Sequence, residues 1–345
     1  MDVRLSPEQR ALRDSAAQLV DRLTAGSVAD LDDAERRAKL AAAVAGSAWR
    51  ELRSADDDGH PWATAVEAAI VAEELGRGPA DTAFVGPSLA AELRRLAGAP
   101  PASGAETIAM THDLGDLARS GRADPGAAGV AVDAAGADAA LMLSAQGQLC
   151  QVALPAADGG GPDLTRRIEA LPPDATLVAI DGAATPLPED ALVRLTAFGL
   201  ALACADLVGV MRGTITLASN YAGVRRQYGT LIGSFQAVQH LLADSYVAME
   251  GSRSVALHAA WAVDALPPDE ALAAAATAKA YCARAARSVC EASIQVHGGI
   301  GNTWECLAHV YLRRALADAD LFGGVGRCLE RLLDHYELRT ADGLR

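Results

Sequence analysis

Two segments of the sequence contain residues that could hold a phosphate-bearing ligand. The first places a cation, an amide and aromatic rings around a turn and the start of a helix, at Arg225, Gln227, Tyr228, Phe235 and Gln236. An arginine guanidinium can donate two parallel hydrogen bonds to a phosphate. Arg225 is therefore the candidate cation of a pyrophosphate site.

The second segment is Gln295-Val-His297-Gly298-Gly299-Ile-Gly301, at the end of a predicted helix. Glycine permits a positive φ and lets the backbone approach a ligand closely. A simpler interpretation exists for each segment: Arg225 can be a surface cation, Tyr228 and Phe235 can be core, and the glycines can be a plain helix terminator. His297 is expected to make hydrogen bonds at the helix end rather than to catalyse.

The first hundred residues are predicted to be helical. Ser6 is a suitable N-cap, Pro7 suits the first helical position, and Gln9 completes a capping box. Apolar residues at helical spacing follow, and further helices are predicted over 41–52 and 63–75. These helices would form an N-terminal domain over residues 1–105.

Residues 106–188 have a different pattern, in which Gly, Pro and Asp separate short apolar runs. Such runs predict strands, here at 107–110, 129–132, 140–143, 149–154 and 175–180, in a small antiparallel barrel or sandwich. Helical periodicity returns at 191–221, 235–265, 269–296, 306–317 and 326–337. The last region, 189–345, is predicted to be a four-helix bundle.

Composition excludes some classes of function. A formal net charge of −14 argues against a nucleic-acid partner, which needs a clustered basic surface. No apolar run approaches the roughly 20 residues that span a bilayer, and no signal peptide is visible. A cytoplasmic location and no membrane partner are therefore expected. The six cysteines are scattered without a CxxC pair, so free buried thiols and no metal site are expected.

The two segments at their spacing resemble the flavin-binding signatures of the acyl-CoA dehydrogenase family. The resemblance is strongest over 201–332 and returns at the N-terminus, in the segments that begin at Leu5 and Val71. It implies an N-terminal helical domain, a middle β-barrel, a C-terminal four-helix bundle and an FAD cofactor. In the family, the residues that match Arg225, Gln227 and Tyr228 contact the pyrophosphate and ribityl region.

The resemblance also assigns the remaining positions of both segments. Phe235 and Gln236 would lie near the adenine end of FAD. Gln295, Gly298 and Gly299 match residues with which a neighbouring subunit reaches across to the diphosphate and adenosine. An oligomer is therefore implied, together with an acyl-CoA substrate and an electron-transferring flavoprotein as the electron acceptor.

The chain departs from the family at the catalytic base, which is a glutamate that removes the α-proton of the thioester. Gly323 matches the usual position of that glutamate, and Gly199 matches the position used by a minority of members. Asp206, two helical turns beyond Gly199, is a conceivable substitute, or else an aspartate that joins helices or subunits. Glu305 is a second weak candidate, with helix packing or capping as the alternative.

The middle region departs as well. The family has a tryptophan-containing segment that lines the flavin ring, but this sequence has no tryptophan between Trp62 and Trp261. His112 could replace a ring contact or be an ordinary loop histidine. One side of the cofactor site thus persists while the base and the ring-lining strands do not.

Such asymmetry resembles the short, base-lacking β-type subunits of actinobacterial heteromeric acyl-CoA dehydrogenases, which act on bulky CoA thioesters such as steroid side chains. This chain would then pair with a glutamate-bearing paralogue in an α2β2 assembly. The alternatives are a homomeric dehydrogenase that uses Asp206, a non-catalytic structural or regulatory paralogue, and a flavin-free lyase or dehydratase.

Overall fold

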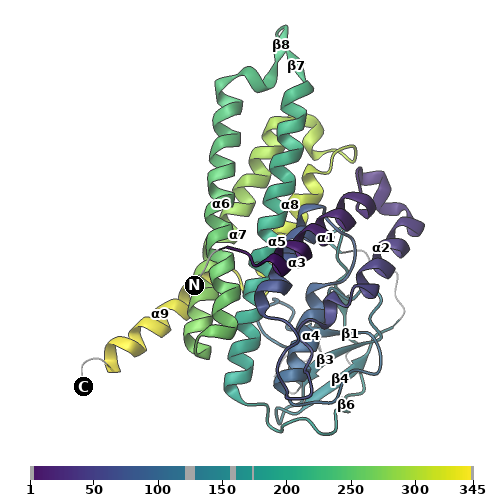
Figure 1. Cartoon of the computed structure of the whole chain (residues 1–345), viewed down its shortest axis with the longest axis vertical. Coiled ribbons are helices and arrows are strands. Elements are labelled where there is room, and N and C mark those ends of the chain that lie inside the picture. Colours follow the sequence, from purple (N-terminus) through teal and green to yellow (C-terminus); the bar gives the residue numbers. More distant parts are fainter. Residues whose placement is uncertain (1–3, 121–128, 156–160, 173–174, 343–345) are drawn as a thin grey trace.

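The protein consists of a long helical bundle, a small β-sheet region and a layer of N-terminal helices between them. A computed structural model describes residues 4–120, 129–155, 161–172 and 175–342. Figure 1 shows the bundle along the long axis, the sheet at the lower right, and the C-terminal helix pointing away from the rest. The predicted fold class, mainly α with a small central β region, is confirmed.

Four α-helices form the N-terminal layer: α1 (Pro7–Leu23), α2 (Ala34–Gly46), α3 (Ala65–Arg77) and α4 (Val85–Leu96). Short 3-10 helices cover Val28–Asp32 and Trp49–Glu51. The predicted capping box of Ser6 and Gln9 is present. The helix expected at 41–52 begins earlier instead, because the Asp33 carboxylate accepts a hydrogen bond from the Arg36 amide and so caps α2.

The middle region is one six-stranded sheet in the order β5-β2-β1-β3-β4-β6. Its strands are β1 (Glu106–Met110), β2 (Val130–Val132), β3 (Ala139–Leu143), β4 (Leu149–Ala153), β5 (Glu169–Ala170) and β6 (Val178–Ala179). All neighbouring pairs are antiparallel except β1 and β3. Within the described residues the sheet is open rather than a closed barrel, because β5 and β6 each pair on one side only.

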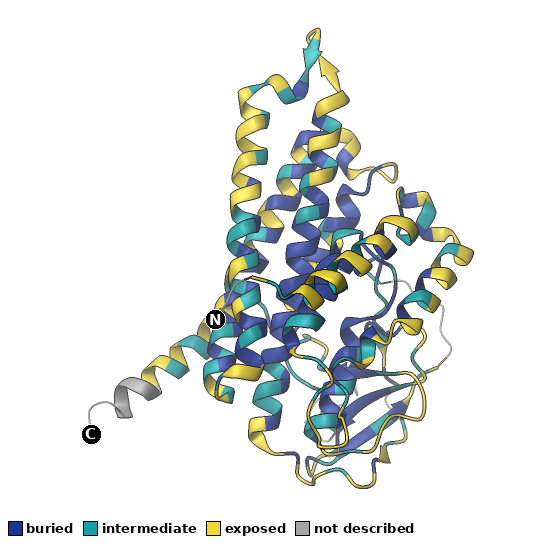
Figure 2. Cartoon of the chain, viewed as in Figure 1, coloured by how far each residue is buried: buried dark blue, intermediate teal, exposed yellow. Residues whose placement is uncertain are grey.

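The bundle contains α5 (Glu189–Val224), α6 (Gln236–Ala265), α7 (Pro268–His297) and the shorter α8 (Ala308–Asp320), followed by α9 (Val325–Asp342). Figure 2 shows α5 and α7 largely buried, whereas α6 and α9 keep exposed outer faces. Contrary to the expectation that no segment is apolar over a long enough stretch, α5 could cross a membrane by length and composition, but 78% of its most apolar window is buried inside the protein. That burial is the property of a core helix. The domain limits at 105 and 188 stay a prediction.

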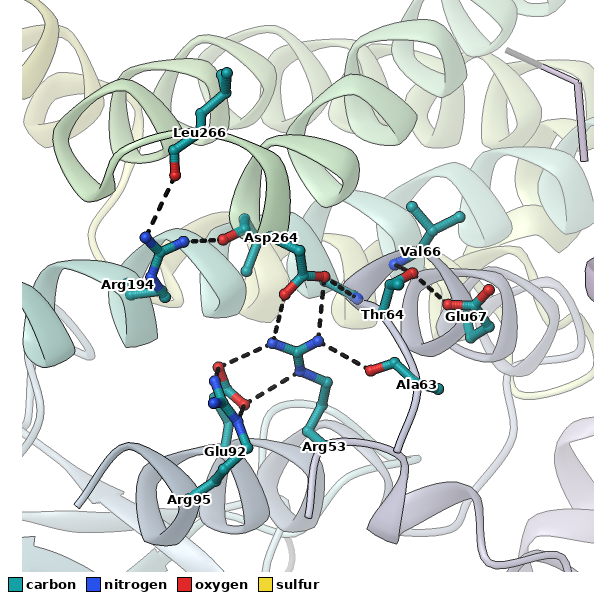
Figure 3. Close-up of polar contacts among 12 residues, drawn as sticks. Arg53, Ala63, Thr64, Val66, Glu67, Glu92, Arg95, Arg194, Asp264 and Leu266 are labelled. Carbon is teal, nitrogen blue, oxygen red and sulfur yellow. Dashed lines mark hydrogen bonds and ion pairs between the residues drawn. The ribbon is translucent and has the colours of Figure 1, made fainter. Parts of the chain in front are cut away.

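One buried arginine joins the N-terminal layer to the bundle. Arg53 is fully buried and binds the carboxylates of Glu92 on α4 and Asp264 on α6, with nitrogen–oxygen distances of 2.8–3.1 Å. Figure 3 shows its guanidinium between the two carboxylates. Each acid lies far from Arg53 in the sequence, so this contact fixes how α4 and α6 are placed relative to each other.

Glycines let α3 approach α5 closely, and this packing is testable. A Cβ added at Gly209 would lie within 3.0 Å of the backbones of Glu73 and Arg77. We expect Gly209→Ala to lower the free energy of unfolding by about 1–3 kcal/mol, as overpacking does. Gly223→Ala is the matched control on the same helix, because nothing lies within 4 Å of its Cβ. Chemical denaturation should show no loss of stability for that control, because alanine is favoured over glycine inside a helix by up to about 1 kcal/mol.

Candidate functional site

The first candidate segment forms a hairpin that projects from one end of the bundle. β7 (Arg226–Gln227) pairs with β8 (Thr230–Leu231) through a two-residue loop of Tyr228 and Gly229. Both loop residues have a positive φ, 53° and 80°, which is the pattern of a type I′ turn. Tyrosine rarely adopts this conformation. The turn nevertheless presents the Tyr228 side chain to solvent, with 95% of it exposed.

The polar side chains beside the hairpin have no protein partners. Arg225, Gln227, Gln236 and Gln295 are all exposed, and in the part of the chain that the structure describes their side chains make no hydrogen bond or ion pair. Arg225 adds only backbone hydrogen bonds, with Tyr221 and Ile232. Their donors and acceptors are therefore free to bind a ligand.

The second candidate segment ends α7. Gly298 has a φ of 65°, which favours glycine, and begins a short 3-10 helix over Gly298–Asn302. A Cβ added at Gly298 or Gly299 would meet no atom within 4 Å. At Gly299 the packing of the chain itself therefore does not require glycine. The exposed, open backbone there suits the close approach of another molecule.

The two segments lie side by side in one chain. The Tyr221 ring at the end of α5 stacks on the His297 imidazole, with ring centroids 4.5 Å apart. Val296 shares a buried apolar cluster with Ala218 and Ile232, and Phe235 packs against that cluster. Phe235 is thus half-buried at the edge of the core and also 6.4 Å from the Tyr228 ring. The tertiary structure therefore places the end of the first segment, at Phe235, beside the end of α7 that carries the second segment.

His297 supports the helix end rather than facing a ligand. It is buried, and its Nδ1 lies 2.8 Å from the Ser293 carbonyl oxygen. Burial opposes protonation of the imidazole, but the hydrogen bonds with Cys306 and with the Ser293 carbonyl raise the pKa of His297 above its usual value. This arrangement agrees with the hydrogen-bonding role expected from the sequence.

The two positions that match the family's base lie in the interior. Gly323 is buried with a φ of 88°, and a Cβ there would come within 2.6–3.2 Å of the Arg327 side chain. Gly199 is buried on α5, and a Cβ there would lie within 2.5 Å of three atoms of the Phe322 ring. Neither position has room for a larger residue without rearrangement.

Asp206 lies in a buried ion cluster and is a poor candidate for the base. The Arg314 guanidinium donates two hydrogen bonds to its carboxylate, at 2.8 and 2.6 Å, and an Arg166 nitrogen lies 2.7 Å away. Arg166 also pairs with Asp318. Burial alone would raise the pKa of Asp206, but the two guanidiniums hold it well below its usual range. A general base is best with a pKa near the working pH, so the cluster favours a structural role.

Glu305 and His112 are exposed, and the described residues offer neither of them a hydrogen bond or an ion pair. The capping role considered for Glu305 is therefore not observed.

Two hollows of ligand size lie elsewhere. One of about 390 Å³ is lined by residues of α1, α3 and α6, and one of about 370 Å³ lies between α4 and the sheet. No metal-binding group of residues is found in the described ranges.

The sequence did not reveal two buried features near Gly323. Phe322 has a positive φ of 60° and is 1% exposed, and Lys279 is fully buried with its Nζ 2.5 Å from the Leu321 carbonyl oxygen. Burial lowers the pKa of Lys279. Lys279 interrupts an otherwise apolar stripe of a predicted helix, and this signal in the sequence could have indicated a buried polar contact near Phe322.

Comparisons with known proteins agree with this fold. The family model for the acyl-CoA dehydrogenase C-terminal domain matches residues 194–325. The acyl-CoA dehydrogenase IpdE2 of Mycobacterium tuberculosis is 34% identical over 268 residues, 77% of this chain and 76% of IpdE2. The acyl-CoA dehydrogenase FadE34 of that organism is 44% identical over 128 residues, which is 37% of this chain but 18% of FadE34.

Solved structures with the same fold cover nearly the whole chain. The ChsE4–ChsE5 complex from Mycobacterium tuberculosis matches with a TM-score of 0.78 at 23% identity, over 98% of this chain and 99% of that chain. The Tcur3481–Tcur3483 steroid ACAD G363A variant matches with a TM-score of 0.77 at 22% identity, over 97% and 99%. These structures support the fold; they do not by themselves assign chemistry.

Proposed function

This chain belongs to the acyl-CoA dehydrogenase family, and from that premise we propose that it is the base-lacking subunit of a heteromeric, FAD-dependent acyl-CoA dehydrogenase. The reaction would introduce a double bond between the α- and β-carbons of an acyl-CoA thioester. This chain would supply part of the cofactor site, and a glutamate-bearing paralogue would supply the base.

The observation that carries the proposal is the glycine at position 323. Glycine has no group that accepts a proton, and the positive φ of Gly323 together with the nearby Arg327 side chain opposes a glutamate there. The alternative position, Gly199, is filled by the Phe322 ring. The described residues thus offer no carboxylate at either place.

The cofactor side of the site fits the proposal because its groups are exposed and free. Arg225 would hold the FAD pyrophosphate with its guanidinium, and the Gly298–Gly299 backbone would lie against the diphosphate and adenosine. Gln227, Gln236 and Gln295 would add amide hydrogen bonds, and the Tyr228 and Phe235 rings would give apolar contact. Bound FAD would accept the hydride that leaves the β-carbon.

The proposed partners follow from the relatives. ChsE4 and ChsE5 form a complex with each other, which supports an assembly of unlike subunits here. An electron-transferring flavoprotein would take up the electrons. The exposed outer faces of α6 and α9 (Figure 2) leave surface for a second subunit. A cytoplasmic location and an absence of nucleic-acid and membrane partners remain predictions.

Two other functions are less well supported. A homomeric dehydrogenase that uses Asp206 as its base is disfavoured, because Asp206 is fully buried between two arginines. A purely structural paralogue would have no use for unpaired exposed groups such as Arg225 and Gln295 around an open glycine backbone. These groups favour a chain that still binds a cofactor.

The test is to purify the chain alone and together with candidate glutamate-bearing paralogues, and to record the flavin absorption bands before and after anaerobic addition of acyl-CoA. We expect bleaching only in the complex. Changing the partner's glutamate to glutamine should abolish bleaching and keep the flavin, whereas Asp206→Asn in this chain should leave the bleaching rate per folded complex unchanged. A yellow single chain that bleaches by itself would refute the proposal.

A further inference from the structure

We propose that Phe322 closes this chain's own acyl-binding site, so that the chain cannot accept an acyl group even where it holds part of the cofactor. The inference rests on the proposed function for the identity of the site. The geometry is independent of that function, because it consists of the contacts that one buried ring makes. The ring stands where two separate segments of the chain meet.

The Phe322 ring is seated on α5. A Cβ at Gly199 would lie within 2.5 Å of the ring carbons Cε2, Cδ2 and Cζ, so the ring lies directly on the glycine backbone. Phe322 is 1% exposed and belongs to the main apolar core. Gly199 and Gly323, the two positions that match the family's base, therefore meet at this ring.

The backbone that carries the ring is fixed at each residue. The Leu321 carbonyl accepts a hydrogen bond from Lys279 Nζ at 2.5 Å, and the Phe322 carbonyl accepts one from Arg331 at 2.6 Å. The Gly323 carbonyl lies 3.8 Å from the Cys328 thiol that donates to it. Phe322 itself has a φ of 60°, an uncommon conformation for a bulky residue. A strained residue persists where its surroundings over-determine it, so the turn is built to hold the ring in place.

The Phe322 ring and the Gly199 backbone leave no room between them, because even a single added Cβ would lie 2.0–2.5 Å from ring atoms. Restoring a glutamate at position 323 would therefore not be enough to restore turnover, because the ring would still occupy the space beside Gly199.

Binding measurements test whether the ring excludes an acyl tail. Octanoyl-CoA and free CoA are titrated against the full chain, purified with its partner if it requires one, with any partner site blocked by a tight non-reactive ligand. The wild type is expected to bind the two equally within about twofold. Phe322→Ala is expected to prefer octanoyl-CoA by tenfold or more, since the methylene groups of the acyl tail would then be buried. If the alanine variant does not fold, Phe322→Leu is used in its place, and a smaller preference for octanoyl-CoA is expected.

Phe198→Ala is the matched control. Phe198 precedes Gly199 on α5 and is as deeply buried as Phe322. Its ring contacts a different partner, because the Arg53 guanidinium lies 5.1 Å from the ring centroid. Its removal leaves a similar cavity and should give no preference for octanoyl-CoA. A wild type that already prefers octanoyl-CoA, or a Phe322→Ala variant that gains no preference, would overturn the proposal.

A double-mutant cycle tests the contact without any ligand. Gly199→Ala should lower the unfolding midpoint of the wild type, and it should do so much less in the Phe322→Ala background, because the ring that the new methyl group meets is gone. Gly223→Ala, with open space at its Cβ, should behave the same in both backgrounds. Equal effects of Gly199→Ala in the two backgrounds would sink the proposal. Neither readout uses FAD, so a failure here is distinct from a failure of the flavin-bleaching test.

Discussion

Replacing Asp206 with alanine is expected to lower the free energy of unfolding by about 3–5 kcal/mol, the usual effect of removing one partner from a buried ion pair. Asp206 and Arg314 are buried, the Arg166 side chain is only 8% exposed, and the two arginines would lose a shared carboxylate. Arg314 also donates to the Ala80 carbonyl at 2.8 Å and to Thr165 Oγ1 at 3.0 Å. The cluster therefore ties α5 and α8 to the N-terminal layer and the sheet region.

Equilibrium denaturation in urea measures this loss. Asp14→Ala is the control, because the Asp14 side chain is 61% exposed in its pair with Arg13, and exposed pairs contribute about 0–1 kcal/mol. A variant Asp206→Ala that is as stable as the wild type yet inactive would show that Asp206 acts in catalysis instead. The expected result is lower stability with unchanged turnover per folded complex.

The same carboxylate predicts how stability depends on pH. The pKa of Asp206 in the folded protein lies below its value in the unfolded chain, so the unfolded chain binds the proton more readily. Its contribution is fully present above the unfolded pKa of about 3.9 and is lost as the pH falls toward the folded pKa. When the pH falls from 6 to 3, the free energy of unfolding should therefore decrease less in Asp206→Ala than in the wild type.

Changing Arg225 to alanine in the assembled enzyme is expected to weaken FAD binding by about 100-fold. Hydrogen bonds to charged groups are worth about 1.5–3 kcal/mol each, and every 1.4 kcal/mol is tenfold in affinity. The Arg225 side chain has no partner within the described residues, so its loss should not disturb the fold. Flavin titration and the flavin-to-protein ratio after gel filtration give the two readouts.

Two further variants sharpen the Arg225 result. Arg225→Lys keeps the positive charge but cannot form the bidentate hydrogen bonds of a guanidinium, so an intermediate affinity for FAD is expected. Arg287→Ala is the control, since Arg287 is an exposed arginine of α7 paired with Glu291 on the same helix. Unchanged flavin affinity in Arg225→Ala, with normal turnover of the complex, would favour a structural paralogue over a cofactor-binding subunit.

The sequence by itself determined most of the helices and the local backbone of the two candidate segments. Caps and apolar periodicity are local signals, so the start of α1 and the limits of the long helices of the bundle were predicted within a few residues of those observed. The Tyr228-Gly229 turn and the Gly298-Gly299 pair are also local, because backbone conformation at these positions depends on the residue itself. The absence of a glutamate at 323 was visible in the sequence for the same reason.

Only the tertiary structure decided which distant residues meet. The pairing of β1 with β3, the insertion of Arg166 and Arg314 beside Asp206, and the seating of Phe322 on Gly199 join segments far apart in the chain. Apolar periodicity says that a face is buried but not what it is buried against, because burial free energy has no direction. Asp206 could therefore be taken from sequence as a candidate base, whereas its two arginine partners in the structure favour a structural role.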